Sequence, residues 1–350
     1  MSGTKSTVVV TGVAGNLGQR LLPQLADFQV IGIDLKPPAD GFTGQFESMD
    51  LGQEASCLEL TQLLRDSGAM GVIHLAFVMD PVRTGVLDVD RMWHINVAGT
   101  ARVLEAITEA NRESAVVQKF IFPSSVSAYG PDMPTAVGED APLNAHTLPY
   151  AVHKKECDLV VQQRAPSLRN CSVFILRPHI FAGASVENYL MGAFRGTPNG
   201  KGKRAARMRQ HGSRLPCMLP FGKKYLDNKI QFIHVDDMAR LIAWILQREP
   251  EVQRLTTLNV AGRGEPMTFG QCIRMAGAKL IRVPGKWAMR KILQVLWSWK
   301  ISAIPPDAVP YMSGQYIMNT DRLKNFLGAD YEKVIRHTIT DAFTDSFRKA

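Results

Sequence analysis

The chain has 350 residues, of which 45% are hydrophobic and 21% are charged, and its formal net charge is +9. This composition is typical of a globular protein, and the length predicts one large domain or two. No run reaches the ~20 apolar residues that a membrane span requires, and the apolar run after Lys5 is too short for a signal peptide. The five scattered cysteines show no metal-ligand spacing, so we expect reduced thiols and a cytoplasmic protein.

The first predicted element is a buried parallel strand at residues 8–10, because valines run there without polar interruption. Glycines then follow at G-x-x-G-x-x-G spacing, and leucines recur afterwards at helical spacing. Strand, glycine turn and helix form the context of a dinucleotide fingerprint, in which the backbone approaches a pyrophosphate at a helix N-terminus. We expect cofactor contacts from the turn residues Gly12, Ala14, Gly15, Asn16, Leu17 and Gly18.

A second predicted strand, residues 28–34, ends in Asp34, which lies 22 residues after Gly12. This is close to the spacing of about 20 residues at which a carboxylate bonds the adenosine ribose hydroxyls. A carboxylate there repels a 2′-phosphate, and the glycine turn holds no Arg or Lys to attract one. The sequence therefore favours NAD over NADP as the cofactor, although Lys36 lies nearby.

Strands and helices alternate in the rest of this half of the chain. We expect strands at residues 71–76 and 119–123 and helices at residues 55–64 and 88–111. Such alternation predicts an α/β fold of the Rossmann type, a doubly wound parallel sheet with ligands at the carboxyl ends of its strands.

The candidate catalytic residues are Ser125, Tyr150 and Lys154. Positions i and i+4 share a helix face, so the tyrosine and the lysine should point into the same cleft. A phenol of pKa near 10 is a poor base at neutral pH, and a neighbouring ammonium stabilises its anion. With a serine hydroxyl holding the substrate oxygen, the three side chains form a proton relay for oxidising an alcohol with a nicotinamide cofactor.

The chain resembles an extended short-chain dehydrogenase/reductase of the NAD-dependent epimerase/dehydratase family. The segments that carry the resemblance run in order from residue 8 to about 261, and they are residues 11–18, 34, 50–51, 74–76, 96–100, 124–130, 150 with 154, 176–178, 232–237 and 259–261. Each motif alone is weak, but their joint order and spacing are specific.

The resemblance implies a role for each matching residue. Tyr150 matches the general acid/base, and Lys154 matches the residue that lowers the pKa of this tyrosine and holds the nicotinamide ribose. Ser125 matches the hydroxyl position, and Ser124 is the neighbouring candidate for it. Asp50 and Leu51 match adenine contacts, and Pro178 falls where the backbone meets the carboxamide. The remaining cofactor-binding positions that it implies are Leu75, Ala76 and Asn96, and Tyr150 is expected to contact the cofactor as well.

The expected organisation is an NAD-binding domain at residues 1–180 with a return segment at 232–261, and a substrate-binding domain at 181–231 and 262–350. The active site should lie between them. The resemblance also implies a homodimer formed through the helices at residues 88–111 and 149–164.

The substrate half departs from the UDP-sugar epimerases of the family. Ile230 stands where they have an arginine for the nucleotide diphosphate, and Ile180 where they have an asparagine. The first expectation is therefore a dehydrogenase acting on a hydrophobic, sterol- or lipid-like alcohol, with a UDP-sugar 4-epimerase that retains NAD as the alternative. A third interpretation is a non-enzymatic NAD sensor, but a sensor needs no proton relay.

The histidines show no metal spacing, so no metal site is expected. His234 is interpreted as structural, because Asp236 has the position of an N-cap for the following helix.

Two basic segments have no role in these motifs. Nine bases and no acid lie between Glu187 and Asp227, and the glycines among them suggest a mobile loop. This loop either binds phosphate or an anionic surface, or it is a solvated basic loop without a ligand. Residues 286–300 form an amphipathic helix flanked by basic residues and tryptophans, interpreted first as a core helix over the substrate pocket and second as a membrane-interface helix. Peripheral membrane contact thus stays open, whereas nucleic acid is not an expected partner, because few aromatics accompany the bases.

Overall fold

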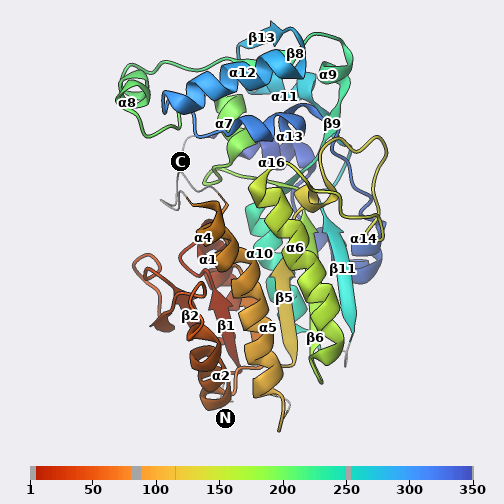
Figure 1. Cartoon of the computed structure of the whole chain (residues 1–350). Helices are drawn as coiled ribbons and strands as arrows, with labels where there is room; N and C mark the ends of the chain where they lie inside the picture. Colours follow the sequence, from red (N-terminus) through yellow and green to blue (C-terminus); the bar gives the residue numbers. More distant parts are fainter. Residues whose placement is uncertain (1–4, 80–87, 115, 250–253, 349–350) are drawn as a thin grey trace.

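A seven-stranded parallel sheet forms the centre of the protein in a computed structural model that describes residues 5–79, 88–114, 116–249 and 254–348 (Figure 1). The strand order is β11-β6-β5-β4-β1-β2-β3. Their bounds are β1 Thr7–Thr11, β2 Gln29–Asp34, β3 Gln45–Ser48, β4 Gly71–His74, β5 Lys119–Pro123, β6 Ser172–Pro178 and β11 Leu255–Val260. The predicted doubly wound Rossmann-type fold is confirmed.

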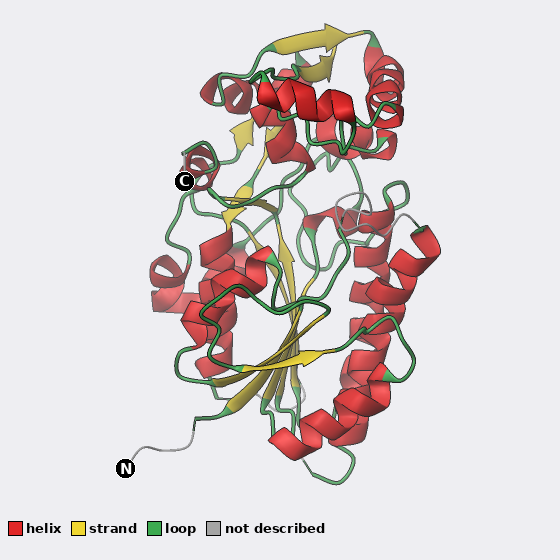
Figure 2. Cartoon of the chain, turned by 90° about the vertical axis from the view of Figure 1, so that its left-hand side faces the viewer, coloured by secondary structure: helices red, strands yellow, loops and turns green. Residues whose placement is uncertain are grey.

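Helices cover both faces of this sheet (Figure 2). One face packs against α2 (Ser56–Ser67), α5 (Gly99–Ala110) and α6 (Pro149–Arg164). The other packs against α1 (Asn16–Leu21), α10 (Val235–Gln247), α14 (Asp321–Leu327) and α15 (Tyr331–Val334). Strands covered on both faces must be apolar on both, which explains the uninterrupted valines of β1.

The helix expected at residues 88–111 is divided into three parts. Asp88 caps α4 (Val89–Trp93), a π-helical turn follows at His94–Ala98, and α5 completes the run. Single π-turns inside helices occur often at functional sites. This one holds Asn96, a predicted cofactor-binding residue.

A smaller lobe with its own apolar core lies beyond the carboxyl edge of the sheet (Figure 1). Strand β8 (Cys217–Pro220) pairs in parallel with β13 (Leu280–Val283), and β9 (Lys229–Ile230) pairs with β12 (Met267–Thr268). The helices of the lobe are α7 (Tyr189–Arg195), α8 (Lys203–Gln210), α9 (Lys224–Asp227), α11 (Phe269–Met275), α12 (Gly285–Ser298) and α13 (Val309–Ser313). Helices α14 and α15, which also fall within the range expected for the substrate domain, lie against the sheet instead.

The segment between Glu187 and Asp227 is not the loop that its glycines suggested. It contains α7, α8, β8 and α9, and only short connections separate them. Alanines and long basic side chains favour a helix in α8, while Gly200 and Gly202 lie before it and Gly212 after it, in the connections.

The chain crosses between the sheet and the lobe through a third short pair, β7 (Ile180–Ala182) with β10 (Phe232–His234). Helix α16 (Ile339–Asp345) packs beside this pair, because the aromatic rings of Phe232 and Phe343 lie 5.1 Å apart. Among the described residues, no helix combines the length and the apolar character needed to cross a membrane.

Candidate active site

The glycine turn is pressed against the end of strand β4. Gly12 has φ +70°, and a Cβ added to it would lie 2.5 Å from the backbone nitrogen of Ala76. A Cβ on Gly18 would lie 2.4 Å from the carbonyl oxygen of Val13, where α1 closes on the turn. Both positions therefore require glycine, and the turn brings the backbone close to the carboxyl edge of the sheet.

Asp34 lies at the end of β2 beside this turn. Its Oδ2 accepts a hydrogen bond from the Ala14 N–H at 3.0 Å, and its Oδ1 accepts one from the Leu35 N–H at 2.7 Å. These bonds hold the carboxylate next to the glycine turn. The residues predicted to bind the pyrophosphate and the adenosine ribose are thus brought together.

Asp50 and Leu51 follow β3 on the same edge. Asp50 Oδ1 accepts the Gly52 N–H at 2.9 Å, which makes a tight turn, and the Leu51 side chain is buried. Arg102 from α5 donates to the Leu51 carbonyl oxygen at 3.0 Å. The turn is therefore fixed to α5.

Asn96 is fully buried, and its amide group is bonded to the backbone of Val78. Its Oδ1 accepts the Val78 N–H at 2.7 Å, and its Nδ2 donates to the Val78 carbonyl at 3.0 Å. This pairing fixes the segment after β4, which includes Leu75 and Ala76. Asn96 thus shapes the segment that faces the glycine turn.

His74 connects three elements behind this segment. Its Nδ1 lies 2.7 Å from the Thr11 hydroxyl and its Nε2 lies 3.0 Å from the Thr100 hydroxyl. Burial, aided by the nearby Lys154 charge, lowers the pKa of His74 to about 3. The imidazole is therefore neutral and structural.

Ser125 and Tyr150 meet at the end of β5. Ser125 caps the short 3-10 turn Val126–Tyr129, and its Oγ accepts bonds from the Ser127 N–H at 3.1 Å and the Ser127 hydroxyl at 2.9 Å. Burial raises the pKa of Tyr150, and hydrogen bonding to the Ser125 and Ser127 hydroxyls lowers it in part. The predicted serine–tyrosine pair is present, and Ser127 is a third member that the spacing did not reveal.

The Lys154 ammonium lies one helical turn from Tyr150 in α6. It donates to the Pro123 carbonyl at 2.7 Å and lies 3.6 Å from the centre of the Phe77 ring. Burial lowers its pKa to about 8, against the opposing charges of Cys157 and Asp158.

Phe77 is a second residue of the site that the sequence motifs did not identify. Its ring packs edge-on against Tyr150, with centroids 5.7 Å apart, while its face meets the Lys154 ammonium. It therefore contacts both ends of the Tyr-x-x-x-Lys pair. A phenylalanine directly after the His74–Ala76 motif was the only available signal.

The end of β6 carries Pro178, which pairs with Val260 of β11. The next residue, His179, is buried, and its Nδ1 accepts the Ile180 N–H at 2.9 Å while its Nε2 lies 3.2 Å from the Tyr316 carbonyl oxygen. Burial lowers its pKa to about 3. This neutral imidazole fixes the turn between β6 and β7.

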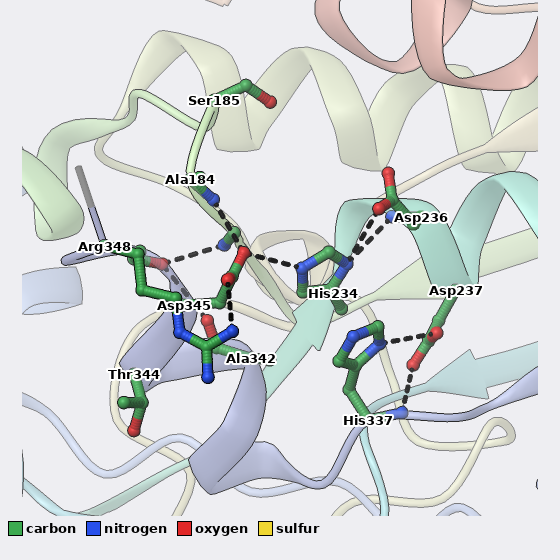
Figure 3. A network of polar contacts seen from close by, with 12 residues as sticks. Ala184, Ser185, His234, Asp236, Asp237, His337, Ala342, Thr344, Asp345 and Arg348 are labelled. Carbon is green, nitrogen blue, oxygen red and sulfur yellow. Dashed lines mark hydrogen bonds and ion pairs between the residues drawn. The ribbon is translucent and has the colours of Figure 1, made fainter. Parts of the chain in front are cut away.

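His234, not Asp236, caps helix α10 (Figure 3). Its Nδ1 accepts the Asp236 N–H at 3.2 Å, so the expectation of an Asp236 cap is wrong by two residues. The other ring nitrogen lies 3.1 Å from Asp345 Oδ2, which also accepts the Ala184 N–H at 3.0 Å. His234 is structural, as interpreted from the sequence.

The His234 ring stacks on that of His337, with centroids 3.8 Å apart (Figure 3). Beyond Ala184, Ser185 accepts two hydrogen bonds from the Asn16 amide, at 3.1 and 3.2 Å. The glycine turn, the β7–β10 pair and helix α16 are therefore linked by contiguous polar contacts. This linkage fixes one side of the predicted cofactor site relative to the lobe.

The substrate side is apolar at the two positions singled out in the sequence. Ile230 is fully buried in β9, and Ile180 is half-buried in β7. A cavity of about 40 Å³ in the lobe is walled by apolar side chains of α7, β8 and α12, among them Phe194, Leu219 and Leu293. Nearby Arg195 donates to the backbone oxygens of Ser346 and Val186.

The sequence profile of the NAD dependent epimerase/dehydratase family matches residues 8–261. The chain is 28% identical over 258 residues to UDP-glucose 4-epimerase 4 of Oryza sativa subsp. japonica, a match that covers 68% of this chain and 67% of that protein.

Two solved structures share the fold. The UDP-glucose 4-epimerase of Thermotoga maritima with UDP-glucose has a TM-score of 0.66 at 16% identity and covers 97% of both chains. The UDP-glucuronic acid 4-epimerase of Bacillus cereus, in complex with UDP-glucuronic acid and NAD, has a TM-score of 0.64 at 18% identity. That match covers 97% of this chain and 96% of the Bacillus enzyme.

Proposed function

The chain belongs to the NAD-dependent epimerase/dehydratase family, and we propose that it is a UDP-sugar 4-epimerase that retains its NAD. The observation that carries the proposal is the Ser125–Tyr150 pair, with Lys154 one turn along α6, on the strand edge that also holds the glycine turn and Asp34. The rice relative, which is named a UDP-glucose 4-epimerase, supports the substrate class.

The residues of the chain fit a bound dinucleotide. Gly12 and Gly18 permit a turn that any Cβ would obstruct, and Asp34 is held beside it by the Ala14 N–H. We propose that this turn holds the pyrophosphate, that Asp34 holds the adenosine ribose, and that Asp50 and Leu51 contact the adenine. Lys154 and the Pro178 backbone are assigned to the nicotinamide end, and Asn96 supports Leu75 and Ala76 from behind.

Bound NAD supplies the hydride acceptor for the reaction. Tyr150 removes the proton from the sugar hydroxyl while the carbon that bears it is oxidised, and it returns a proton when that carbon is reduced on its other face. The Ser125 hydroxyl bonds the reacting oxygen and is itself oriented by Ser127. The Lys154 ammonium, which donates to the Pro123 carbonyl one helical turn from Tyr150, is assigned the role of favouring the phenolate anion.

The UDP-sugar assignment replaces the first expectation from the sequence. The relatives reported above are UDP-sugar 4-epimerases, and none supports a sterol- or lipid-like alcohol. Because Ile230 and Ile180 provide no polar contact, other groups of the lobe must bind the diphosphate. We also propose that the protein is a homodimer through α5 and α6.

The proposal is tested by incubating the purified protein with UDP-glucose and following the sugar by NMR. We expect UDP-galactose to form without accumulation of NADH and without added cofactor. Tyr150→Phe should reduce conversion by about 10²- to 10⁴-fold while the protein keeps its NAD. Conversion that is unchanged in Tyr150→Phe would contradict the mechanism, and inactivity toward UDP-glucose, UDP-galactose and UDP-glucuronic acid alike would contradict the substrate class.

A further inference from the structure

Helix α12 exposes an apolar stripe on the outer side of the lobe. Only Met289 and Leu293 of this helix are buried. By contrast, Trp287 is 72% exposed, and Ile292, Val295 and Trp299, which is the C-cap, are 38%, 46% and 55% exposed. Single exposed apolar residues are common on protein surfaces, but four large ones on one helix indicate an interaction site. The expectation of a core helix therefore holds for Met289 and Leu293, which pack on the core of the lobe. It does not hold for the exposed apolar side chains of the same helix.

Helix α8 lies directly beside the end of α12 (Figure 1). The Gly202 N–H donates to the Lys300 carbonyl at 2.9 Å, and the Gly200 N–H donates to the Ile301 carbonyl at 2.9 Å. The Arg204 guanidinium lies over the Trp299 ring at 4.8 Å. Trp299, at the end of α12, and the bases of α8 thus belong to one continuous surface, and this surface together with the exposed apolar side chains of α12 is called the Trp–basic surface.

The charge of the whole chain is concentrated in the lobe that bears this surface. Residues 188–226 contain nine Lys and Arg and no acid, and residues 266–306 contain seven and no acid. These sixteen positive charges compare with a net charge of +9 for the chain, so all other residues together carry −7. Two of the bases on α12 are paired with acids, Lys286 with Asp132 and Arg290 with Asp307, so the exposed positive charge beside Trp299 comes from α8.

We propose that the Trp–basic surface docks on an anionic lipid bilayer. Tryptophans and aliphatic side chains on a helix that lies flat enter the headgroup boundary, while flanking Lys and Arg contact anionic headgroups. Each base near such a surface changes partitioning about fivefold. Nucleic acid would use the charge and could stack on the tryptophans, but it offers nothing for Ile292 and Val295. This inference does not depend on the reaction that the protein catalyses.

The test is flotation of the full-length protein with vesicles of phosphatidylcholine alone or with 30% phosphatidylglycerol, an amount chosen on the order of that in anionic membranes. We expect binding only to the anionic vesicles and a steep loss as salt rises. Trp287→Ala with Trp299→Ala should reduce binding by at least about tenfold, since the stripe supplies the buried apolar area. Lys203→Glu with Arg207→Glu should reduce it by roughly 30-fold or more.

Two control variants test whether binding depends on this surface or only on the overall charge and exposed apolar area of the protein. Lys324→Glu with Lys333→Glu makes the same charge change on α14 and α15, and Leu58→Ala removes a side chain on α2 that is 78% exposed. Both should bind like the wild type. Equal binding to neutral and anionic vesicles, equal losses in the control variants, or no flotation at all would overturn the proposal. So would tryptophan variants that change only the oligomeric state or only the retention of a polynucleotide.

Discussion

At the scale of single residues, the proposed proton relay includes Ser125, whose hydroxyl is oriented by Ser127. Because Ser127 donates to the Ser125 Oγ, the Ser125 hydroxyl hydrogen is free to point toward the phenol. Tyr150→Phe should reduce turnover by about 10²- to 10⁴-fold, the usual contribution of general acid–base catalysis. Ser127→Ala should cost only about two- to tenfold, because the Ser127 hydroxyl bonds Ser125 and the phenol but is assigned no proton transfer of its own.

Steady-state rates of the two variants, with NAD content measured on each, check this ranking. The matched control is Ser167→Ala, which removes an exposed hydroxyl at the far end of α6 that bonds the Arg164 carbonyl. A Ser127→Ala loss as large as that of Tyr150→Phe would show that Ser127 itself meets the substrate.

Asp34 should decide the choice between NAD and NADP. Asp34→Asn keeps an oxygen for the Ala14 N–H but removes the negative charge that repels a 2′-phosphate. We expect NAD binding to weaken by about tenfold or more, since a hydrogen bond to a charged group is worth about 1.5–3 kcal/mol, and NADP binding to strengthen relative to it. Titration calorimetry on apo protein measures both affinities.

Asp27→Asn provides the control for that experiment, because Asp27 is exposed in the turn before β2. It should leave the ratio of the two affinities unchanged. An Asp34→Asn protein with the wild-type ratio would remove Asp34 from the ribose site.

At the scale of elements, two neutral histidines fix the strand ends that carry the site. His74 joins β4 to β1 and α5, and His179 joins β6 to the Tyr316 segment, each with both ring nitrogens in use. Their folded pKa values of about 3 lie far below the ordinary value of about 6.5. As pH falls below 6.5 the unfolded chain takes up protons at these rings and the folded chain does not, so stability is lost between about pH 6.5 and pH 3.

The expected loss is roughly 2 kcal/mol per histidine between pH 7 and pH 5. Urea unfolding at the two pH values measures the difference. His74→Asn and His179→Asn should each be less stable at pH 7 but should lose less on acidification. The exposed His146→Asn variant is the control, and a pH dependence that survives both buried substitutions would contradict this account.

The sequence predicted the local parts of the site better than its long-range contacts. The glycine turn, Asp34 and the Ser125–Tyr150–Lys154 set follow from spacing along strands and helices, which the backbone period determines. Phe77 and Ser127 escaped notice because their roles depend on how loops fold onto α6 and on a 3-10 turn. The α8 helix was mistaken for a loop because its flanking glycines outweighed the helix-forming residues between them.

At the scale of the whole molecule, helices α5 and α6 form the face assigned to the dimer. Arg164 of α6 pairs with Glu105 of α5, so the two helices lie side by side. Leu159 on α6 is 41% exposed, as expected for an apolar residue that becomes buried when two chains associate. We expect two chains per particle in sedimentation equilibrium and a monomer for Leu159→Glu.

Leu58→Glu places the same charge on α2, which lies on the other side of α5 from α6, and this variant should remain dimeric (Figure 1). A wild-type monomer, or dissociation by both variants alike, would contradict a dimer through these helices.

The most direct test of the central claim follows deuterium placed at C4 of UDP-glucose. If the protein is a UDP-sugar 4-epimerase with retained NAD, the UDP-galactose formed keeps the label at C4, and the two sugars reach the same ratio from either side. Loss of the deuterium to solvent or to free NADH, or oxidation of the sugar without return to C4, would contradict the account.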